Sequence, residues 1–361
     1  MSTPRVSVIM AAYNYERFIG RAIDSALGQT YGREHIELIV VDDGSTDATA
    51  DAVRAFGPAV RYVYKPNGGV LSTVNAGLAL ATGDYVTLLS ADDTFPPGRV
   101  ARLAGLLSAR PDLGLVYGDM EIVDDEDRLL EPSFFASVNI APRRGGYGGA
   151  TLGAMLRNNI VSGGALMMRR ELADLVHPIP PEAPAEDWWI ATRAAALGAI
   201  DWVPDPVYRY RWHGGNDSLY ARGERHIRFA RRELPFRRAL VRGLRTGQVP
   251  PDHVMVGVAA LISCATVLRA AGDDVDAVFA GGAGAAVEAE QARRAHEAAG
   301  DHVAALFAAA RAVAAAPMDP IALAELPSAA DALARARRAA GIETTEVVAC
   351  RMDELLDHPE A

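Results

Sequence analysis

The sequence predicts an α/β protein with a mixed, mostly parallel sheet and a C-terminal helical extension. Three observations carry this prediction. In the first 120 residues, short runs of β-branched and apolar residues alternate with segments of helical spacing. Turn-forming or acidic residues follow most of these runs. From about residue 223 the strand signal fades, and the chain becomes arginine-rich and then alanine-rich. A chain of 361 residues has room for one large domain or two ordinary ones.

Four apolar runs in the first part of the chain are predicted to be strands. Continuous apolar runs are typical of strands that are buried on both faces. The four runs are VSVIMAAY (6–13), IELIVVDD (36–43), VRYVY (60–64) and DYVTLLS (84–90). Segments with helical spacing follow at 16–27, 47–55, 71–81 and 98–107, and Ser45 or Thr46 can cap the second of them. This β-α-β-α rhythm predicts helices that cover a parallel sheet. Residues 111–215 are less regular and indicate completion of the sheet plus loops.

Composition and charge exclude several classes of protein. A net charge of −10 argues against broad nucleic-acid binding. Cys264 and Cys350 have no Cys or His partner at metal-binding spacing, so the sequence predicts neither a zinc site nor a disulfide framework. The start, MSTPRVSVIMAAYN, does not have the pattern of a signal peptide, and a cytoplasmic protein is expected. The longest apolar run, 254–268, is shorter than the roughly 20 residues of a spanning helix and predicts a buried helix.

Polar and aromatic side chains follow three of the predicted strands. They are Tyr13, Asp42, Asp43, Asp92 and Asp93. Ligands of such sheets bind outside the carboxyl ends of the strands. By itself VVDDGSTD (40–47) has two interpretations. It is a turn that caps a helix, or Asp43 accepts hydrogen bonds from a base or ribose while Tyr13 stacks on the base.

The segment KPNGGV (65–70) places two glycines ahead of a predicted helix. Gly68 and Gly69 allow the backbone to approach a ligand, but the segment lacks the GK[ST] ending of a phosphate-binding P-loop. Lys65 is the only lysine in the chain, and a solvated turn is the favoured interpretation of it.

Two adjacent acids end the fourth predicted strand in LLSADDT (88–94). Asp92 and Asp93 supply hard oxygen ligands, which suit Mg²⁺ or Mn²⁺ bound together with substrate phosphates. The alternative is an exposed acidic turn before a helix. Position 90 is Ser90, so a third nearby acid is missing.

Two further stretches offer groups for catalysis. In AEDWWIATRAAALG (185–198), Glu186 and Asp187 begin an amphipathic helix, where they complement the helix dipole or act as a general base. Trp188 or Trp189 could form a flat wall for a sugar ring, although a core position is favoured for either. In YRYRWHGGNDS (208–218), His213 is a metal ligand, a phosphate donor or a structural histidine.

Taken together and in this order, these segments resemble the inverting nucleotide-sugar glycosyltransferases of family 2, which have the GT-A fold. The matching segments are VSVIMAAYNYERFIGRAIDSALGQT, ELIVVDDGSTD, NGGV, NAGLALATGDYVTLLSADD, SGGALMMRRE, the AEDWW acid pair and YRYRWHGG. They span about residues 4–218 and imply a GT-A catalytic domain over 1–223, a Rossmann-like mixed sheet. The resemblance does not extend to residues 224–361, the α-helical extension.

The resemblance also implies roles for individual residues. Asp43 matches the uracil-binding aspartate, Asp92 the acid at the ribose and diphosphate, and Asp93 the metal ligand. Asp187 matches the catalytic base, which Glu186 supports. The remaining assignments are Ala11, Tyr13, Asn14, Gly68 and Gly69 at the nucleotide, Asp92 and His213 at the metal, and Trp188 and Asn159 on the sugar and acceptor side. The sequence departs from the family pattern at Ser90 and in lacking an arginine before Asn75.

The expected function is transfer of a sugar from a UDP- or dTDP-sugar to an acceptor hydroxyl with inversion, assisted by Mn²⁺ or Mg²⁺. The resemblance points to polysaccharide, cell-envelope glycan or glycolipid assembly, with a carbohydrate or lipid-linked acceptor. One alternative is nucleotidyl transfer, which AAYNYERF disfavours because it has no glycine or lysine. Another is a non-catalytic module that binds nucleotide sugars.

The extension begins with an arginine-rich segment. Residues 222–245, from Arg222 to Arg245, hold nine arginines and two glutamates with apolar residues between them. This segment is either a solvated helix packed on the catalytic domain, which is favoured, or a peripheral contact with an anionic membrane. The alanine-rich remainder would pack on the catalytic domain or form a homodimer interface.

Overall fold

The computed structural model describes residues 3–137 and 159–213, apart from 182 and 198, together with residues 231, 233, 234, 272, 273, 294 and 298. The chain divides into two compact units, Met1–Thr151 with Asn159–Ser218 and Leu152–Asn158 with Leu219–Ala361. In the second unit Arg231 pairs with Asp273 at 2.6 Å. Apart from those single residues, the predictions for residues 222–361 lie outside the described part, and the domain boundary at 223 stays a prediction. Among the described helices, none is long and apolar enough to span a membrane.

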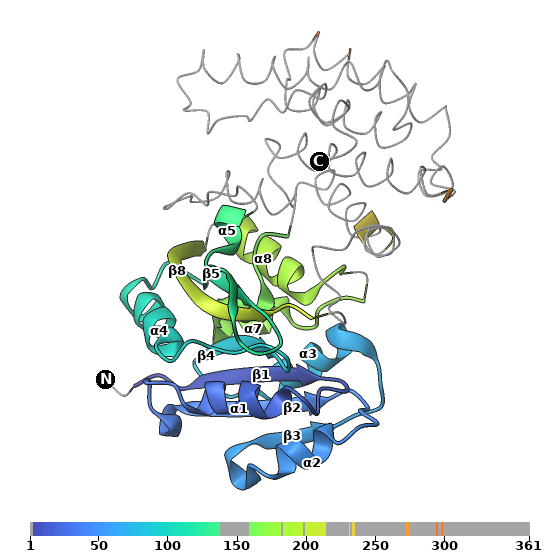
Figure 1. Ribbon diagram of the computed structural model, residues 1–361. Coiled ribbons are helices and arrows are strands. Elements are labelled where there is room, and N and C mark those ends of the chain that lie inside the picture. The colour runs from blue at the N-terminus through green and yellow to red at the C-terminus, as the bar shows by residue number, and fades with distance from the viewer. Residues whose placement is uncertain are drawn as a thin grey trace. The chain divides into compact units, whose positions relative to one another are not determined.

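The first four strands confirm the predicted parallel arrangement. They are β1 (Val6–Ala12), β2 (Ile36–Asp42), β3 (Arg61–Tyr64) and β4 (Tyr85–Ser90). β1 pairs in parallel with both β2 and β4, and β2 pairs with β3 (Figure 1). Their side chains are almost all buried in β1, β2 and β4, because these runs have helices on both faces. The predicted ends are each within one residue of those observed.

The second half of the sheet makes it mixed. The strands are β5 (Leu115–Val123), β6 (Leu129–Glu131), β7 (Leu166–Arg169) and β8 (Ile200–Arg211). Within the described residues the order is β3-β2-β1-β4-β7-β5-β6, and β8 also pairs with β5. β7 runs antiparallel to β4 and to β5, and β8 is parallel to β5. A bridge between Thr94 and Arg209 joins the end of β8 to the segment after β4.

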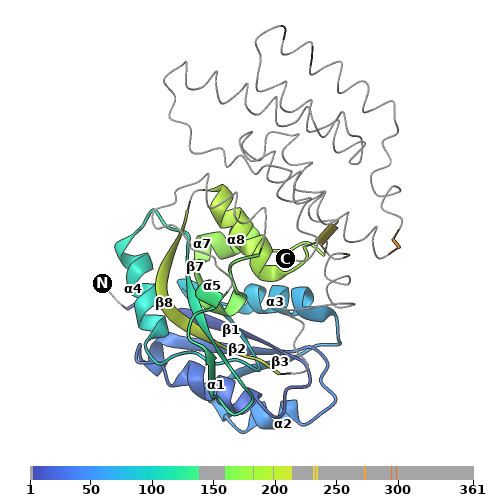
Figure 2. The same ribbon diagram turned by 45° about the horizontal axis from the view of Figure 1, so that its top comes forward.

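Helices cover the sheet on both sides. They are α1 (Ile19–Leu27), α2 (Thr49–Arg54), α3 (Gly69–Leu80), α4 (Arg99–Ala109), α5 (Phe134–Ser137), α7 (Arg170–Val176) and α8 (Glu186–Ala196). Figures 1 and 2 show α1 and α2 on one face of β1–β3 and α3 on the other. Right-handed crossovers require this, because the connection from β3 to β4 runs in the opposite direction along the sheet. The strand order therefore reverses between β1 and β4, and the region outside the carboxyl ends of these strands is the expected ligand site.

The predicted cap of the second helix is wrong. α2 begins at Thr49 with Ala48 at its N-cap, and neither Ser45 nor Thr46 caps it. The Asp47 carboxylate instead accepts hydrogen bonds from the Thr49 amide at 3.0 Å and the Thr49 hydroxyl at 2.5 Å. The loop between β2 and α2 is thus longer than predicted. It lies at the carboxyl edge of the sheet.

Candidate active site

The carboxyl ends of the strands bring most of the predicted site residues to one edge of the sheet. They form three groups. The Asp43 group is Tyr13, Asp43, Lys65, Gly68 and Gly69; the Asp92 group is Asp92, Asp93, Tyr208, Arg211 and His213; the Asp187 group is Asn159, Gly163, Glu186 and Asp187. Asp42 is used for structure, since its carboxylate accepts from the Ser45 amide at 2.8 Å and the Tyr62 hydroxyl at 2.6 Å.

In the Asp43 group, a buried carboxylate lies at the start of α3. Asp43 accepts hydrogen bonds from the amides of Gly68 at 2.9 Å and Gly69 at 2.8 Å, and forms an ion pair with Lys65. Burial opposes its ionisation, but the hydrogen bonds from Lys65, from the two glycine amides and from Thr73 outweigh burial and lower the pKa of Asp43. The expectation that Lys65 lies in a solvated turn is wrong, because its ammonium neutralises this carboxylate.

Around Asp43 the end of β1 supplies the other predicted nucleotide residues. Tyr13 is 47% exposed, so its ring is accessible to a ligand. Ala11 lies within β1, opposite Val41 of β2. Asn14 has a left-handed backbone with φ of 58°, and its side-chain oxygen accepts from the Thr46 amide at 2.8 Å. Asn14 therefore ties the loop after β1, which includes Tyr13, to the loop after β2.

In the Asp92 group, Asp93 is enclosed by protein donors. It is 2% exposed, and its two oxygens accept from the Tyr208 hydroxyl at 2.5 Å and the Arg211 amide at 2.7 Å. Burial and the neighbouring charge of Asp92 raise the pKa of Asp93 well above its ordinary value, despite those hydrogen bonds. Burial and the charge of Asp93 also raise the pKa of Tyr208, which keeps its hydroxyl proton and donates it.

Asp92 makes a different contact. Its Oδ2 lies 3.0 Å from Nε2 of His213, and the His213 ring stacks on Phe18 with centroids 5.3 Å apart. A carboxylate and an imidazole at this distance can share a divalent ion. Within the described ranges no group of three or more His, Cys, Asp or Glu side chains gathers as a complete metal site. Other ligands would have to come from substrate or water.

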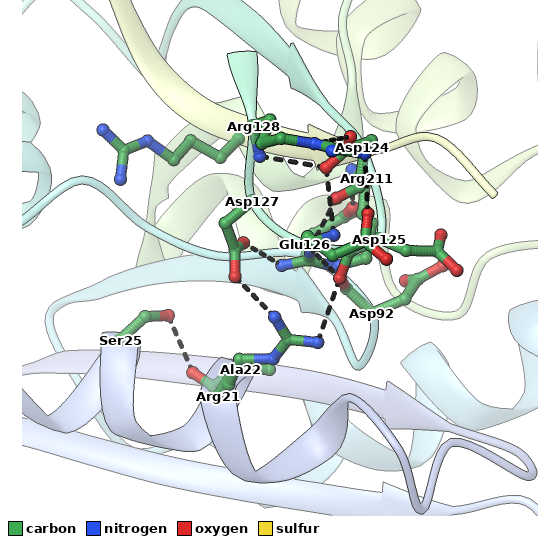
Figure 3. A network of polar contacts seen from close by, with 12 residues as sticks. Arg21, Ala22, Ser25, Asp92, Asp124, Asp125, Glu126, Asp127, Arg128 and Arg211 are labelled. Carbon is green, nitrogen blue, oxygen red and sulfur yellow. Dashed lines mark hydrogen bonds and ion pairs between the residues drawn. The ribbon is translucent and has the colours of Figure 1, made fainter. Parts of the chain in front are cut away.

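Arg211 joins this group to an acidic turn between β5 and β6 (Figure 3). The side chain is buried, with Nε donating to the Asp92 carbonyl at 2.8 Å and Nη1 to the Asp124 carbonyl at 2.7 Å. Nη2 pairs with the Asp127 carboxylate, which also binds Arg21 of α1. Through Arg211 the backbone of Asp92 is thus connected to β8, to the turn between β5 and β6, and to α1.

The two acids of the Asp187 group, Glu186 and Asp187, lie in the first turn of α8, as the sequence predicts. The Asp187 carboxylate accepts from Asn159 Nδ2 at 2.8 Å, the Gly163 amide at 3.0 Å and the Trp188 amide at 2.7 Å. Burial raises the pKa of Asp187 in spite of these three donors. A β-carbon built on Gly163 would lie 3.3 Å from the Glu186 carboxylate. Glu186 therefore lies beside the same glycine whose amide binds Asp187.

Tyr208 links the Asp92 and Asp187 groups. Its ring packs so closely on Gly164 that a β-carbon there would lie 1.9 Å from a ring carbon. The adjacent Gly163 amide bonds Asp187, and the Tyr208 hydroxyl bonds Asp93. Glycine at 164 is therefore required for the close approach. The sequence patterns did not identify Tyr208 or Arg211, because their partners Asp92 and Asp93 lie more than 110 residues away. The strand alternation of 208–211 was the one available signal.

Trp188 does not face a ligand. Its side chain is 0% exposed and belongs to the core, so the assignment of Trp188 to the sugar side is wrong and the alternative interpretation, a core tryptophan, holds. Its neighbour Trp189 donates from Nε1 to the Val176 carbonyl at 3.0 Å. Both rings anchor α8 and hence the position of Asp187.

A mixed sheet of this order, with acids at the switch point, defines the GT-A class of transferases. Residues 7–175 match the profile of Glycosyl transferase family 2. An uncharacterised glycosyltransferase of Nostoc sp. is 30% identical over 236 residues, which cover 60% of this chain and 67% of that protein. The chain belongs to family 2 of the glycosyltransferases and is a glycosyltransferase. The family and fold that the motifs implied are confirmed.

Two further similarities are more limited. Chondroitin synthase of Pasteurella multocida is 41% identical over 130 residues, which cover 35% of this chain and 13% of the synthase. A solved mannosyltransferase from Pyrobaculum calidifontis, in complex with GDP-Man and Mn²⁺, has a TM-score of 0.53 at 24% identity and covers 88% of this chain and 87% of its own. At that identity the likeness supports the fold.

Proposed function

We propose that this glycosyltransferase moves a sugar from a nucleoside-diphosphate sugar to an acceptor hydroxyl with inversion at the anomeric carbon. The observation that carries the proposal is the carboxylate of Asp187, held at the start of α8 by Asn159 and the Gly163 amide. Its raised pKa suits a general base. The contact of Tyr208 with Gly164 keeps this base near the Asp92–His213 pair, where we expect the donor diphosphate.

In the proposed reaction Asp187 accepts the proton of the acceptor hydroxyl. The hydroxyl oxygen bonds to the anomeric carbon while the bond from that carbon to the diphosphate oxygen breaks on the opposite face. The electron pair of the broken bond leaves with the nucleoside diphosphate. The proton remains on Asp187 until solvent takes it. Glu186, in the same turn of α8, would support Asp187, and Asn159 would orient it.

For the donor we propose that Tyr13 stacks on the base and Asp43 accepts a base N–H. The low pKa of Asp43 keeps it an acceptor at neutral pH. Gly68 and Gly69 support Asp43 through their amides, and Ala11 and Asn14 shape the end of β1. The imide N–H that uracil and thymine carry between two carbonyls fits such a carboxylate, so UDP- and dTDP-sugars are the favoured donors.

For the metal we propose Mn²⁺ or Mg²⁺ at Asp92 and His213, with donor phosphates and water as the other ligands. When bound, the ion supplies Lewis-acid neutralisation of charge on the leaving diphosphate. Asp93 was assigned as a ligand by resemblance. Asp93 is the more buried of the two acids, 2% exposed against 6% for Asp92, and it accepts hydrogen bonds from Tyr208 and Arg211, so we propose that it chiefly orients Asp92.

The function is tested by incubating the protein with a panel of nucleotide sugars, with and without Mn²⁺. Release of free sugar and nucleoside diphosphate supports the transferase, and pyrophosphate release would support nucleotidyl transfer instead. Binding without any turnover would favour a non-catalytic module. A thermal-shift screen of the same panel identifies the base.

Nucleotide is expected to protect Lys65 from amine-directed chemistry. A base at Asp43 lies beside the Lys65 ammonium, and no other lysine exists in the chain to react in parallel. Reductive methylation followed by mass spectrometry should show less label on Lys65 with saturating UDP or dTDP than without. Inorganic phosphate serves as the control. Equal labelling with a nucleotide that is known to be bound would contradict the placement of the base.

Asn159→Ala is expected to move the acid side of the pH–rate profile to higher pH. The Asn159 amide stabilises the ionised form of Asp187, so its loss raises the pKa of that carboxyl further. Because the base must be ionised, transfer is lost at a higher pH as the solution is acidified, and activity returns in alkali. Asn75→Ala is the matched control, since Asn75 bonds the Ile179 backbone instead. A profile that drops at every pH without shifting would argue against this role.

For the acceptor we propose a carbohydrate or a lipid-linked glycan, in keeping with the similarity to chondroitin synthase over part of the chain. For residues 222–245 the solvated helix stays the favoured proposal, with contact to an anionic membrane as the alternative. For the alanine-rich segment, packing on the catalytic domain and a homodimer interface both stay open. Co-sedimentation with anionic liposomes tests the membrane contact, and light scattering of the purified protein tests the homodimer.

A further inference from the structure

Arg211 contacts the support of both members of the Asp92–His213 pair. Its amide donates to the Asp93 carboxylate at 2.7 Å and its Nε to the Asp92 carbonyl at 2.8 Å. Its guanidinium lies 5.5 Å from the centroid of the Phe18 ring, on which the His213 imidazole stacks at an interplanar angle of 19°. The guanidinium groups of Arg17 and Arg21 lie near the same ring, at 4.8 and 5.7 Å. Arg211 therefore contacts Asp92 and Asp93 directly and the His213 imidazole through Phe18.

An acidic turn at residues 124–128 holds this arginine. Nη1 donates to the Asp124 carbonyl, and Nη2 pairs with Asp127. Asp127 adopts a left-handed backbone with φ of 67°, which is uncommon outside glycine. The turn closes on itself, because the Asp124 carboxylate accepts from the amides of Glu126 and Arg128, both at 2.9 Å. The conformation that aims Asp127 at Arg211 is thus fixed within the turn.

Helix α1 ties the same turn down from the other side. Arg17 donates to the Asp125 carboxylate at 2.8 Å, and Arg21 pairs with Asp127 (Figure 3). Phe18, the N-cap residue of α1, lies between these two arginines in the sequence and stacks on the His213 ring. The turn therefore sets the spacing between the start of α1, where Phe18 supports the imidazole, and β8, which ends at Arg211 two residues before His213.

The chemistry of Arg211 explains why another residue would not serve. Arg211 is 1% exposed, and a buried charge persists only where it is paired and hydrogen-bonded. The planar guanidinium meets the Asp92 and Asp124 carbonyls and the Asp127 carboxylate in different directions, which fixes one orientation. A lysine has a single point of charge and cannot reach the Asp92 carbonyl, the Asp124 carbonyl and Asp127 together.

We infer that Arg211, clamped by the acidic turn 124–128, is a positioning residue that sets the distance between Asp92 and His213 and so tunes the affinity of the site for a divalent ion bound with the donor diphosphate. This inference rests on the proposed role of that pair. Arg211 acts through Asp92, Asp93 and Phe18 and touches neither donor nor acceptor.

The test measures UDP affinity by calorimetry in Mn²⁺ and again in EDTA, with dTDP and GDP in parallel. In Arg211→Met the Mn²⁺-dependent gain in affinity should fall by about 10- to 100-fold, the usual effect of removing support behind a metal ligand. Affinity in EDTA should be retained, because the Asp43 group is unchanged. The matched control is Arg209→Met, on the same strand as Arg211. It removes an exposed ion pair with Glu121 of β5. It should keep the full gain.

A second variant covers the case in which Arg211→Met does not fold. Asp127→Asn removes the counter-ion of Arg211 at a residue 40% exposed, and should lose part of the Mn²⁺-dependent gain at an unchanged melting temperature. Glu126→Gln, in the same turn but paired with Arg128, is its control. An unchanged gain in Arg211→Met or Asp127→Asn overturns the inference, and so does equal loss in Mn²⁺ and EDTA. A wild-type protein without any Mn²⁺ effect overturns the metal assignment itself, and the inference with it.

Discussion

Asp187→Asn is expected to bind the donor as the wild type does and to lose transfer. The amide cannot accept the proton of the acceptor hydroxyl, and loss of a general base typically lowers the rate by about 10²- to 10⁴-fold. kcat should fall by that amount, while donor affinity, measured by calorimetry in the absence of turnover, should not change. This separation of chemistry from binding is the signature of a group that acts in the transition state.

The variant is also expected to fold. Asparagine keeps one oxygen for the Asn159 and Trp188 donors and loses the acceptor of the Gly163 amide, which costs about 1 kcal/mol. Glu186→Gln is the matched control in the same helical turn, and its smaller loss of kcat would separate the two acids. Full transfer activity in Asp187→Asn would reject the base assignment.

Asp92→Asn is expected to abolish the dependence of donor binding on Mn²⁺. Replacing an anionic ligand by an amide should cost more than the roughly 10- to 100-fold seen for outer supporting residues. UDP affinity in Mn²⁺ should fall to the value measured in EDTA. The His213 side of the pair offers a second check, because His213→Asn should reduce the same quantity.

Asp93→Asn provides the contrast. The Tyr208 hydroxyl and the Arg211 amide both donate to this carboxylate, so an amide nitrogen there would face a donor in a buried site. That mismatch costs about 1–3 kcal/mol. We expect a lower melting temperature and a smaller change in Mn²⁺ dependence than in Asp92→Asn. A stable Asp93→Asn that loses Mn²⁺ dependence, beside an Asp92→Asn that keeps it, would reverse the two assignments.

Three carboxylates of this site owe their different proton affinities to their surroundings. Burial raises the pKa of Asp93 and of Asp187, whereas an ammonium, two backbone amides and a hydroxyl outweigh burial and lower the pKa of Asp43. Such separation assigns acceptor and base roles within one site. Asp43 is suited to remain an anion, and Asp187 to take up a proton.

Much of this arrangement could be predicted because local patterns encode it. The four parallel strands are continuous apolar runs, so their ends, and with them Asp43 and Asp92, were located to within one residue. Parallel strands bring their carboxyl ends to one edge, which gave the site its place. The start of α8 at Glu186 was equally readable, since two acids precede an amphipathic run.

Other features depended on partners that no local pattern reveals. The sequence predicts Asp43 either as part of a turn that caps a helix or as an acceptor for a base or ribose. Neither prediction includes the amides of Gly68 and Gly69, 25 and 26 residues away, that its carboxylate binds. The flat ring of Trp188 could form a wall for a sugar ring, but it lies in the core. In each case the deciding factor was which distant part of the chain packs against that residue.

The sequence by itself determined the strands, the helices that cross between them and the edge at which the acids gather, because hydrophobic period and turn chemistry are local properties. Only the tertiary structure decided what those acids do. The pairing of β8 with β5 brings Tyr208, Arg211 and His213 against Asp92 and Asp93 from more than 110 residues away. Burial and hydrogen bonding, which set the charge and direction of a carboxylate, arise from that long-range packing.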